Sequence, residues 1–321
     1  MASAIITKRL AFALALCLAA LPAAAADKLT VVLDWFVNPD HAPLVVAREK
    51  GFFEGEGLDV ELVAPADPND PPKLVAAKQA DIAVSYQPQL HLQVQEGLPL
   101  VRIGTLVATP LNSLVVLKDG PVKRIEDLKG RKVGFSVGGF EDALLGAMLA
   151  RHGLKLDDVE LVNVNFSLSP SVIAGQVDGV IGAFRNFELN QMDLAGHPGR
   201  AFYPEEEGVP AYDELIYVAH KDGLARPELR RFLAAVEQAT LWTLNHPDEA
   251  WNLFKATDKA LDDELNHRAW NATLPRLAHS PAALDDGRYR RFAVFLKAQG
   301  LLKAEPPVAS YAVDLLAEKQ P

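Results

Sequence analysis

Cysteine is almost absent from this sequence of 321 residues. The only one, Cys17, lies in an apolar run near the N-terminus. The rest of the chain therefore forms no disulfide, carries no thiol nucleophile and offers no cysteine ligand to a metal. The motifs G-x-S-x-G, H-E-x-x-H and the P-loop are also missing. No catalytic signature stands out, and we expect neither a metal nor a cofactor.

A basic excess is lacking as well. Lys and Arg number 32 against 42 Asp and Glu, which gives a net charge of −10. Without a basic stripe, nucleic acid is not an expected partner. Hydrophobic residues at 49% and charged residues at 23% indicate an ordinary globular protein, and the length suits two lobes or domains.

The N-terminus has the three parts of a secretory signal. Lys8 and Arg9 precede an apolar run from Leu10 to Leu21, and "PAAAAD" follows. We predict a signal peptide over residues 1–26, cleaved after Ala26, and a periplasmic mature protein. The alternative is a transmembrane anchor, but the run is shorter than the roughly 20 residues that a spanning helix needs.

Cys17 raises a second alternative, a lipid attachment site. Leu16, just before it, is larger than the small residue that such a site prefers, so we do not favour lipidation. Loss of Lys8 and Arg9 on cleavage takes the net charge from −10 to −12.

Strands and helices alternate along most of the chain. "LTVVL", "GLDVELV" and "DIAVSY" are strands separated by helical segments, and "RKVGF", "DVELVNV" and "VDGVIGAF" repeat the pattern. Such alternation is typical of an α/β fold with parallel sheets and right-handed crossovers. From Pro227 onward the pattern is helical, with a break at Asn245-His246-Pro247.

Two similar strands bracket the middle of the chain. "SLVVLKDG" leads into this block and "LIYVAHKDG" leads out of it. The pattern predicts one lobe inserted into another, with residues 27–117 and 216–321 forming lobe 1 and residues 118–215 forming lobe 2. The two crossings would act as a hinge.

The stretch "LDWFVNPDHAPL", residues 33–44, is the strongest candidate for a binding site. It places an acid, two aromatic rings, Asn38 and His41 directly after a strand. In α/β proteins, ligands are held where the carboxyl ends of strands meet. His41 beside Asp34 or Asp40 also suggests metal or acid–base chemistry, but a lone histidine here is more typical of a polar loop.

Other aromatic and acidic residues follow later strands. Trp35, Tyr86 and Phe140 come after three different strands, and rings so placed can close on a flat ligand. Glu188 and Glu214 add carboxylates suited to a cationic or amidine-like group. These residues together indicate a flat, amine-bearing ligand.

The glycine turn "GFSVGGF", residues 134–140, is ambiguous. Its backbone N–H groups suit an anion, but we favour a plain structural turn. It lacks the spacing of a dinucleotide-binding loop.

Four stretches resemble one family in order and over nearly the whole mature chain. "LDWFVNPDHAPLVVAREKGFFEGEGLDVEL", "DIAVSYQPQL", "VDGVIGAFRNFEL" and "GVPAYDELIYVAH" are similar to the ThiY-like periplasmic solute-binding proteins of pyrimidine-precursor ABC importers. That family belongs to one superfamily with the thiamine-pyrimidine synthases. The resemblance implies a type II periplasmic-binding-protein fold with two α/β lobes, two crossover strands and a ligand cleft between the lobes.

The same resemblance implies a ligand, partners and a set of contact residues. The ligand would be an aminopyrimidine thiamine precursor of the formylaminopyrimidine type, passed to an ABC permease and its ATPase. We expect the protein to act as a monomer and not as an enzyme. With Phe140, taken from its position after a strand, the predicted ligand-binding residues are Trp35, Asn38, His41, Tyr86, Phe140, Glu188, Tyr212 and Glu214.

Two alternatives remain. The synthases of the superfamily place a lysine for pyridoxal phosphate after the third strand, where this chain has Ser85, and a serine forms no Schiff base. A different small solute is the nearer alternative, either a riboflavin-like ring or a sulfonate such as taurine. A sulfonate should require basic residues, and Arg185 is the only one among the cleft candidates.

Overall fold

The structure of the protein, a computed structural model, describes residues 26–317. The predicted signal peptide lies outside these residues except for Ala26, and so does Cys17. No helix within residues 26–317 is long and apolar enough to span a membrane.

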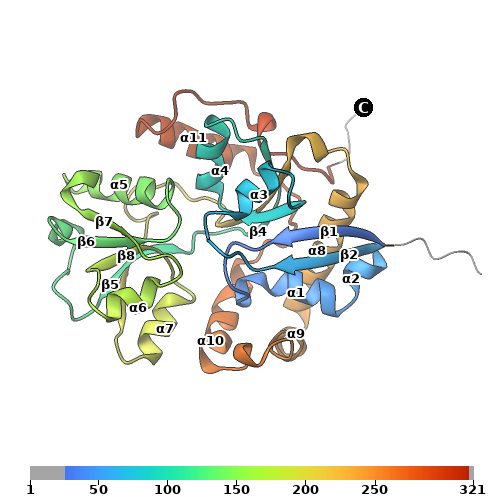
Figure 1. The fold of residues 1–321 in the computed structure, drawn as a ribbon, viewed down its shortest axis with the longest axis horizontal. Helices are drawn as coiled ribbons and strands as arrows, with labels where there is room; N and C mark the ends of the chain where they lie inside the picture. Colours follow the sequence, from blue (N-terminus) through green and yellow to red (C-terminus); the bar gives the residue numbers. More distant parts are fainter. Residues whose placement is uncertain (1–25, 318–321) are drawn as a thin grey trace, which may run out of the picture.

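Two five-stranded mixed sheets form the centres of two lobes (Figure 1). The first sheet has the strand order β2 (Leu58–Val63), β1 (Asp27–Val32), β3 (Ile82–Ser85), β10 (Leu215–His220) and β4 (Leu100–Val107). The second has the order β7 (Glu160–Asn163), β6 (Lys132–Phe135), β8 (Gly179–Phe184), β5 (Asn112–Leu117) and β9 (Gly199–Phe202).

The two sheets have the same internal arrangement. β1 pairs in parallel with β2 and β3, and β6 pairs in parallel with β7 and β8. The fourth strand is antiparallel to its neighbours in both sheets, β10 in the first and β5 in the second. The two similar strands seen in the sequence therefore occupy equivalent positions, one in each sheet.

The position of β5 corrects the predicted lobe boundary. The sequence pattern predicts that residues up to 117 belong to lobe 1, but β5 is hydrogen-bonded to β8 and β9 of the second sheet. The chain therefore crosses between the sheets at residues 108–111, before β5, and returns through residues 203–214 before β10. A buried apolar strand pairs equally well in either sheet, so its composition did not reveal the correct partner.

Helices cover both faces of each sheet (Figure 1). In that view α3 and α4 lie above the first sheet and α1 and α9 below it, whereas α5 lies above the second sheet and α6 and α7 below it. The α-helices are α1 (Ala42–Glu49), α2 (Phe52–Gly55), α3 (Pro71–Ala76), α4 (Gln87–Gln95), α5 (Glu141–Arg151), α6 (Leu168–Ile173), α7 (Glu188–Leu194), α8 (Pro227–Asn245), α9 (Pro247–Lys255), α10 (Glu264–Thr273) and α11 (Asp286–Ala298). The 3-10 helices are η1 (Pro39–His41), η2 (Ile125–Leu128), η3 (Leu156–Asp158), η4 (Lys221–Gly223), η5 (Lys259–Leu261), η6 (Leu274–Arg276) and η7 (Val308–Ser310).

The long helix α8 follows from the sequence pattern. Leu229, Phe232, Leu233 and Val236 recur at helical spacing and are all buried. Pro227 occupies the first turn, where its missing N–H costs little. The helix ends at Asn245 and Pro247 begins α9, so the predicted break is confirmed.

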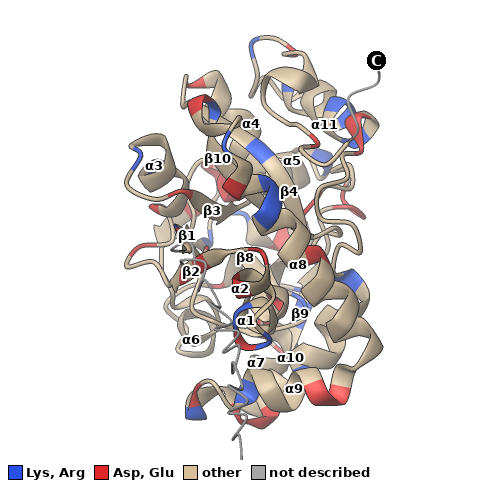
Figure 2. Ribbon diagram, turned by 90° about the vertical axis from the view of Figure 1, so that its right-hand side faces the viewer, with Lys and Arg blue, Asp and Glu red and all other residues tan. Residues whose placement is uncertain are grey.

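Charges of both signs are spread over the ribbon (Figure 2). In the view shown, basic residues alternate with acidic ones along several helices and do not form a stripe. This distribution agrees with the absence of a basic excess in the sequence.

Candidate functional site

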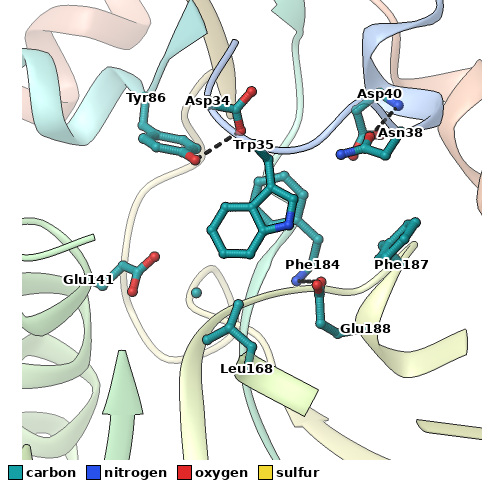
Figure 3. Close-up of a pocket in the computed structure, with 11 residues that line it drawn as sticks. Asp34, Trp35, Asn38, Asp40, Tyr86, Glu141, Leu168, Phe184, Phe187 and Glu188 are labelled. Carbon is teal, nitrogen blue, oxygen red and sulfur yellow. Dashed lines mark hydrogen bonds between the residues drawn. The ribbon is translucent and has the colours of Figure 1, made fainter. Parts of the chain in front are cut away.

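A pocket lies between the two lobes, at the carboxyl ends of strands from both sheets (Figure 3). It encloses about 380 Å³ including its open mouth, but the free cavity inside it measures only about 20 Å³. A ring-sized ligand therefore requires the walls to separate, which two lobes joined by crossing segments permit. Its walls are formed by Asp34, Trp35, Asn38, Asp40, Tyr86, Glu141, Leu168, Gly182, Phe184, Phe187 and Glu188.

The wall from lobe 1 begins with the loop after β1. Asn38 caps η1, because its Oδ1 accepts the N–H of Asp40 at 2.8 Å. Pro39 follows at the first helical position, where proline is favoured. This turn fixes the side chains of Asn38 and Asp40 at the edge of the pocket.

Asp34 is held from two sides. Its Oδ1 lies 2.9 Å from His41 Nε2, and its Oδ2 accepts the Tyr86 hydroxyl at 2.9 Å. His41 Nδ1 accepts the backbone N–H of Asn38 at 3.2 Å, so the ring proton on Nε2 faces the carboxylate. His41 thus orients Asp34 from behind the pocket wall.

The wall from lobe 2 contributes two carboxylates. Glu188 Oε2 accepts the N–H of Phe184 at 2.6 Å. Glu141 Oε2 accepts the N–H groups of Ser136 and Val137 at 2.7 and 3.1 Å. Burial raises the pKa of each carboxyl group to about 8. Each carboxyl group thus has one oxygen bound to backbone N–H groups, and its second oxygen is available to the pocket.

Contacts between the lobes close the cleft. Trp35 meets Phe166 edge-on with 4.6 Å between ring centroids. On the other side of the cleft, Asn69 of lobe 1 accepts the N–H of Gly138 at 3.0 Å and donates to Ser136 O at 3.1 Å. The glycine turn of residues 134–140 therefore contacts lobe 1, and Asn69 makes this contact.

A sequence profile of the family described as NMT1/THI5 like matches residues 38–250. The chain belongs to the NMT1/THI5-like family. A protein of Haemophilus influenzae named for thiamine biosynthesis is 55% identical over 92% of this chain and 94% of its own length. The formylaminopyrimidine-binding protein of Halalkalibacterium halodurans is 35% identical over 71% of this chain and 70% of its own.

Enzymes and binding proteins both occur among the relatives of this NMT1/THI5-like chain. The 4-amino-5-hydroxymethyl-2-methylpyrimidine phosphate synthase of Schizosaccharomyces pombe is 24% identical over 79% of this chain and 76% of its own. Among solved structures, the alkanesulfonate-binding protein SsuA of Xanthomonas axonopodis has a TM-score of 0.71 at 17% identity, covering 90% of this chain and 99% of its own. The expected periplasmic-binding-protein fold is confirmed.

Four of the eight predicted ligand-binding residues line the pocket, namely Trp35, Asn38, Tyr86 and Glu188. The other four do not line it. Phe140 is buried and stacks on Tyr86 with 4.8 Å between centroids. Tyr212 is buried against Phe292, at 5.4 Å between centroids.

Glu214 ties the two crossing segments together. Its Oε2 accepts the N–H groups of Leu111 and Asn112 at 2.5 and 2.8 Å. Burial raises the pKa of this carboxyl group to about 7. Its place is therefore the predicted hinge and not the pocket surface.

Sequence reasoning missed several pocket residues, most notably Glu141. An acid in the first turn of a helix is a common feature, so its position alone carried no functional signal. Phe184 and Phe187 also line the pocket and lie in the stretch "VDGVIGAFRNFEL". The expectation that aromatic residues at strand ends contact the ligand would have selected them as well.

Proposed function

We propose that this protein is the solute-binding component of an ABC importer and captures a thiamine pyrimidine precursor of the formylaminopyrimidine type. The observation that carries the proposal is the pair Glu141 and Glu188, which present carboxyl oxygens to the same pocket that Trp35 lines. An aminopyrimidine has a flat apolar ring and an edge that carries an amino donor beside a ring nitrogen. A carboxyl group with a raised pKa complements that edge, because it donates and accepts at the same time.

The relatives support the same ligand class. The relative from Halalkalibacterium halodurans is named for formylaminopyrimidine binding, and the one from Haemophilus influenzae for thiamine biosynthesis. We propose that Trp35, Asn38, Tyr86 and Glu188 contact the ligand. His41, Phe140, Tyr212 and Glu214 would then hold these contacts and the hinge in place.

A sulfonate ligand fits the pocket poorly. Arg185 is half-buried, but its guanidinium pairs with Glu205 at 2.5 and 3.0 Å and donates to Asn112 O at 3.1 Å. None of the residues that line the pocket is Lys or Arg. A riboflavin-like ligand has three fused rings, which demand a wider separation of the walls than a single ring does.

A pyridoxal phosphate enzyme is also disfavoured by the site. Ser85 ends β3 at the position where the synthases are expected to carry lysine, and its hydroxyl donates to Gln89 Oε1 at 3.0 Å. Neither side chain forms an imine. We therefore propose a binding role with no catalytic step.

The proposal extends to partners and location. Two lobes closing on a ligand would present the permease and ATPase with a shape that the open protein lacks. A periplasmic monomer, exported by the predicted signal peptide, stays our expectation.

Quenching of tryptophan fluorescence tests the proposed function. Formylaminopyrimidine should change the emission of the wild-type protein saturably, and Trp242→Phe should retain that response because Trp242 lies outside the pocket beneath Lys50. Trp35→Phe should lose most of it. A response carried by Trp242, or none at all, contradicts the assigned site. Incubation with pyridoxal phosphate should give no Schiff-base absorbance.

A further inference from the structure

The turn between β6 and α5 already holds a carboxyl group of the protein itself. Backbone N–H groups at a strand-to-helix turn ordinarily suit a phosphate or sulfonate. Here the N–H groups of Ser136 and Val137 are both taken by Glu141 Oε2, at 2.7 and 3.1 Å. The carboxylate that fills this position is 3% exposed. A phosphate or sulfonate would have to displace this carboxyl group to reach the two N–H groups.

The neighbouring strand is shaped to receive the same carboxylate. Gly182 of β8 has a φ of +98°, in the left-handed region that favours glycine. A side chain at this position would overlap the carboxylate of Glu141. The turn and the strand are thus two independent elements that accommodate Glu141, and both Glu141 and Gly182 line the pocket.

The residues around Glu141 offer no positive charge to an anion. Asp34, Asp40 and Glu188 line the same pocket, and no lysine or arginine does. The third N–H of the turn, that of Gly138, is occupied by Asn69 Oδ1 at 3.0 Å. An anionic group in this pocket would therefore meet acidic side chains and no basic one, and it would find three of the turn's N–H groups already bonded.

We propose that Glu141 is a specificity-determining residue, which restricts the pocket to neutral or cationic ligands and excludes phosphate and sulfonate groups. This inference rests on the proposed function in placing the ligand in this pocket. It explains how a fold that also occurs in proteins named for binding alkanesulfonate and nitrate refuses such anions here. For a pyrimidine precursor, the alcohol is accepted and its phosphate ester is rejected.

Two ligands that differ only by a phosphate test the inference. Hydroxymethylpyrimidine and its monophosphate are titrated by calorimetry into the wild type, Glu141→Gln and Glu141→Ala. The wild type should bind the alcohol about 100-fold more tightly or better, on the scale of one decade for each 1.4 kcal/mol. Glu141→Ala frees the two N–H groups and should reduce this ratio at least about tenfold, whereas Glu141→Gln keeps an acceptor oxygen for them and should retain most of it.

Glu160→Gln is the matched control. Glu160 lies on the edge strand β7, exposed and 3.6 Å from Lys132, so this variant replaces a glutamate but leaves the pocket intact. Its ratio should equal that of the wild type. The inference is overturned if the wild type binds the phosphate ester as tightly as the alcohol, or if a folded Glu141→Ala keeps the wild-type ratio.

Failure of the proposed function has a different signature. If the wild type binds neither pyrimidine, the proposed ligand is wrong, and the same variants are titrated with taurine. Gain of taurine binding in Glu141→Ala but not in Glu160→Gln still supports anion exclusion by Glu141. No gain in either variant overturns it.

Discussion

The side-chain amide of Asn186 donates to Asp40 Oδ1 at 2.6 Å and so joins the turn after β8 to the loop after β1. Thr273, the last residue of α10, completes the contact, because its hydroxyl also donates to Asp40 Oδ1, at 2.7 Å. All three side chains are buried. Burial raises the pKa of Asp40 to about 6. The two lobes are thereby fastened together beside the pocket.

Loss of this fastening should shorten the lifetime of the ligand complex. We expect Asn186→Ala to weaken ligand binding about five- to thirtyfold, since Asn186 donates interlobe hydrogen bonds to Asp40 and Thr273 and each contributes on the order of 1 kcal/mol. Stopped-flow measurement should place the change mainly in the dissociation rate. Asn271→Ala, on the exposed side of α10, is the control and should bind normally. An unchanged dissociation rate in Asn186→Ala contradicts the role of the contact.

The aromatic and acidic walls should each matter for affinity. We expect Trp35→Ala and Glu188→Ala to weaken binding about tenfold or more, because each removes at least about 1.4 kcal/mol of ring contact or charged hydrogen bonding. Equilibrium dialysis measures both. Trp242→Ala, which removes a ring from the outer side of α8, should keep the wild-type affinity. Unchanged affinity in both pocket variants would remove the basis for the site.

The buried carboxyl groups should make the protein less stable as the pH rises. The folded protein raises the pKa of Glu141 and Glu188 from 4.5 to about 8, so between these pH values it binds protons that the unfolded chain has lost. The free energy of unfolding should therefore fall with rising pH, by up to about 1.4 kcal/mol per pH unit for each group. The contribution of these two groups to the free energy of unfolding is complete below pH 4.5 and is lost by about pH 8.

Urea denaturation at pH 5.5 and 7.5 measures this dependence. His152, whose pKa Glu207 raises, contributes with the same sign, so the informative quantity is the difference between wild type and variant. Glu188→Gln should show a smaller loss of stability between the two pH values, and Glu160→Gln should match the wild type. Equal pH dependence in the wild type and Glu188→Gln would show that burial of Glu188 is not the cause.

Gly182 should tolerate no side chain. Gly182→Ala places a Cβ against the Glu141 carboxylate at a φ of +98°, and we expect it to lower the free energy of unfolding by about 2 kcal/mol and to weaken binding. Gly146→Ala is the matched comparison: this glycine lies within α5 with nothing near its missing Cβ. It should raise stability by about 0.5–1 kcal/mol. Thermal and urea unfolding compare the two, and a neutral Gly182→Ala would argue against the tight fit.

The sequence predicted the parts of the site that obey a simple spatial rule. Trp35, Asn38 and Tyr86 follow strands β1 and β3, and side chains at the ends of neighbouring parallel strands come together. Glu188 follows β8 and begins α7 by the same rule. The α/β alternation likewise gave the two sheets and the crossings between them.

Other features depended on tertiary contacts that no local pattern encodes. Glu141 reads as an ordinary acid of a helical first turn, and only the folded chain brings its carboxylate back onto Ser136 and Val137. Glu214 sits one residue before a strand, as Glu188 sits after one, yet pairing of β10 between β3 and β4 turns it towards the crossing segments. Pairing with β8 and β9 likewise determines which lobe contains β5.

Calorimetric titration of the mature protein with formylaminopyrimidine, hydroxymethylpyrimidine, thiamine, riboflavin and taurine, in the wild type and in Glu188→Gln, tests the central claim most directly. We predict one-to-one binding of a pyrimidine with a dissociation constant in the micromolar range or below, about −8 kcal/mol or stronger, which the variant weakens while taurine gives no heat. Silence towards every pyrimidine, with taurine or riboflavin binding instead, would leave the two-lobed carrier but contradict the ligand proposed for it.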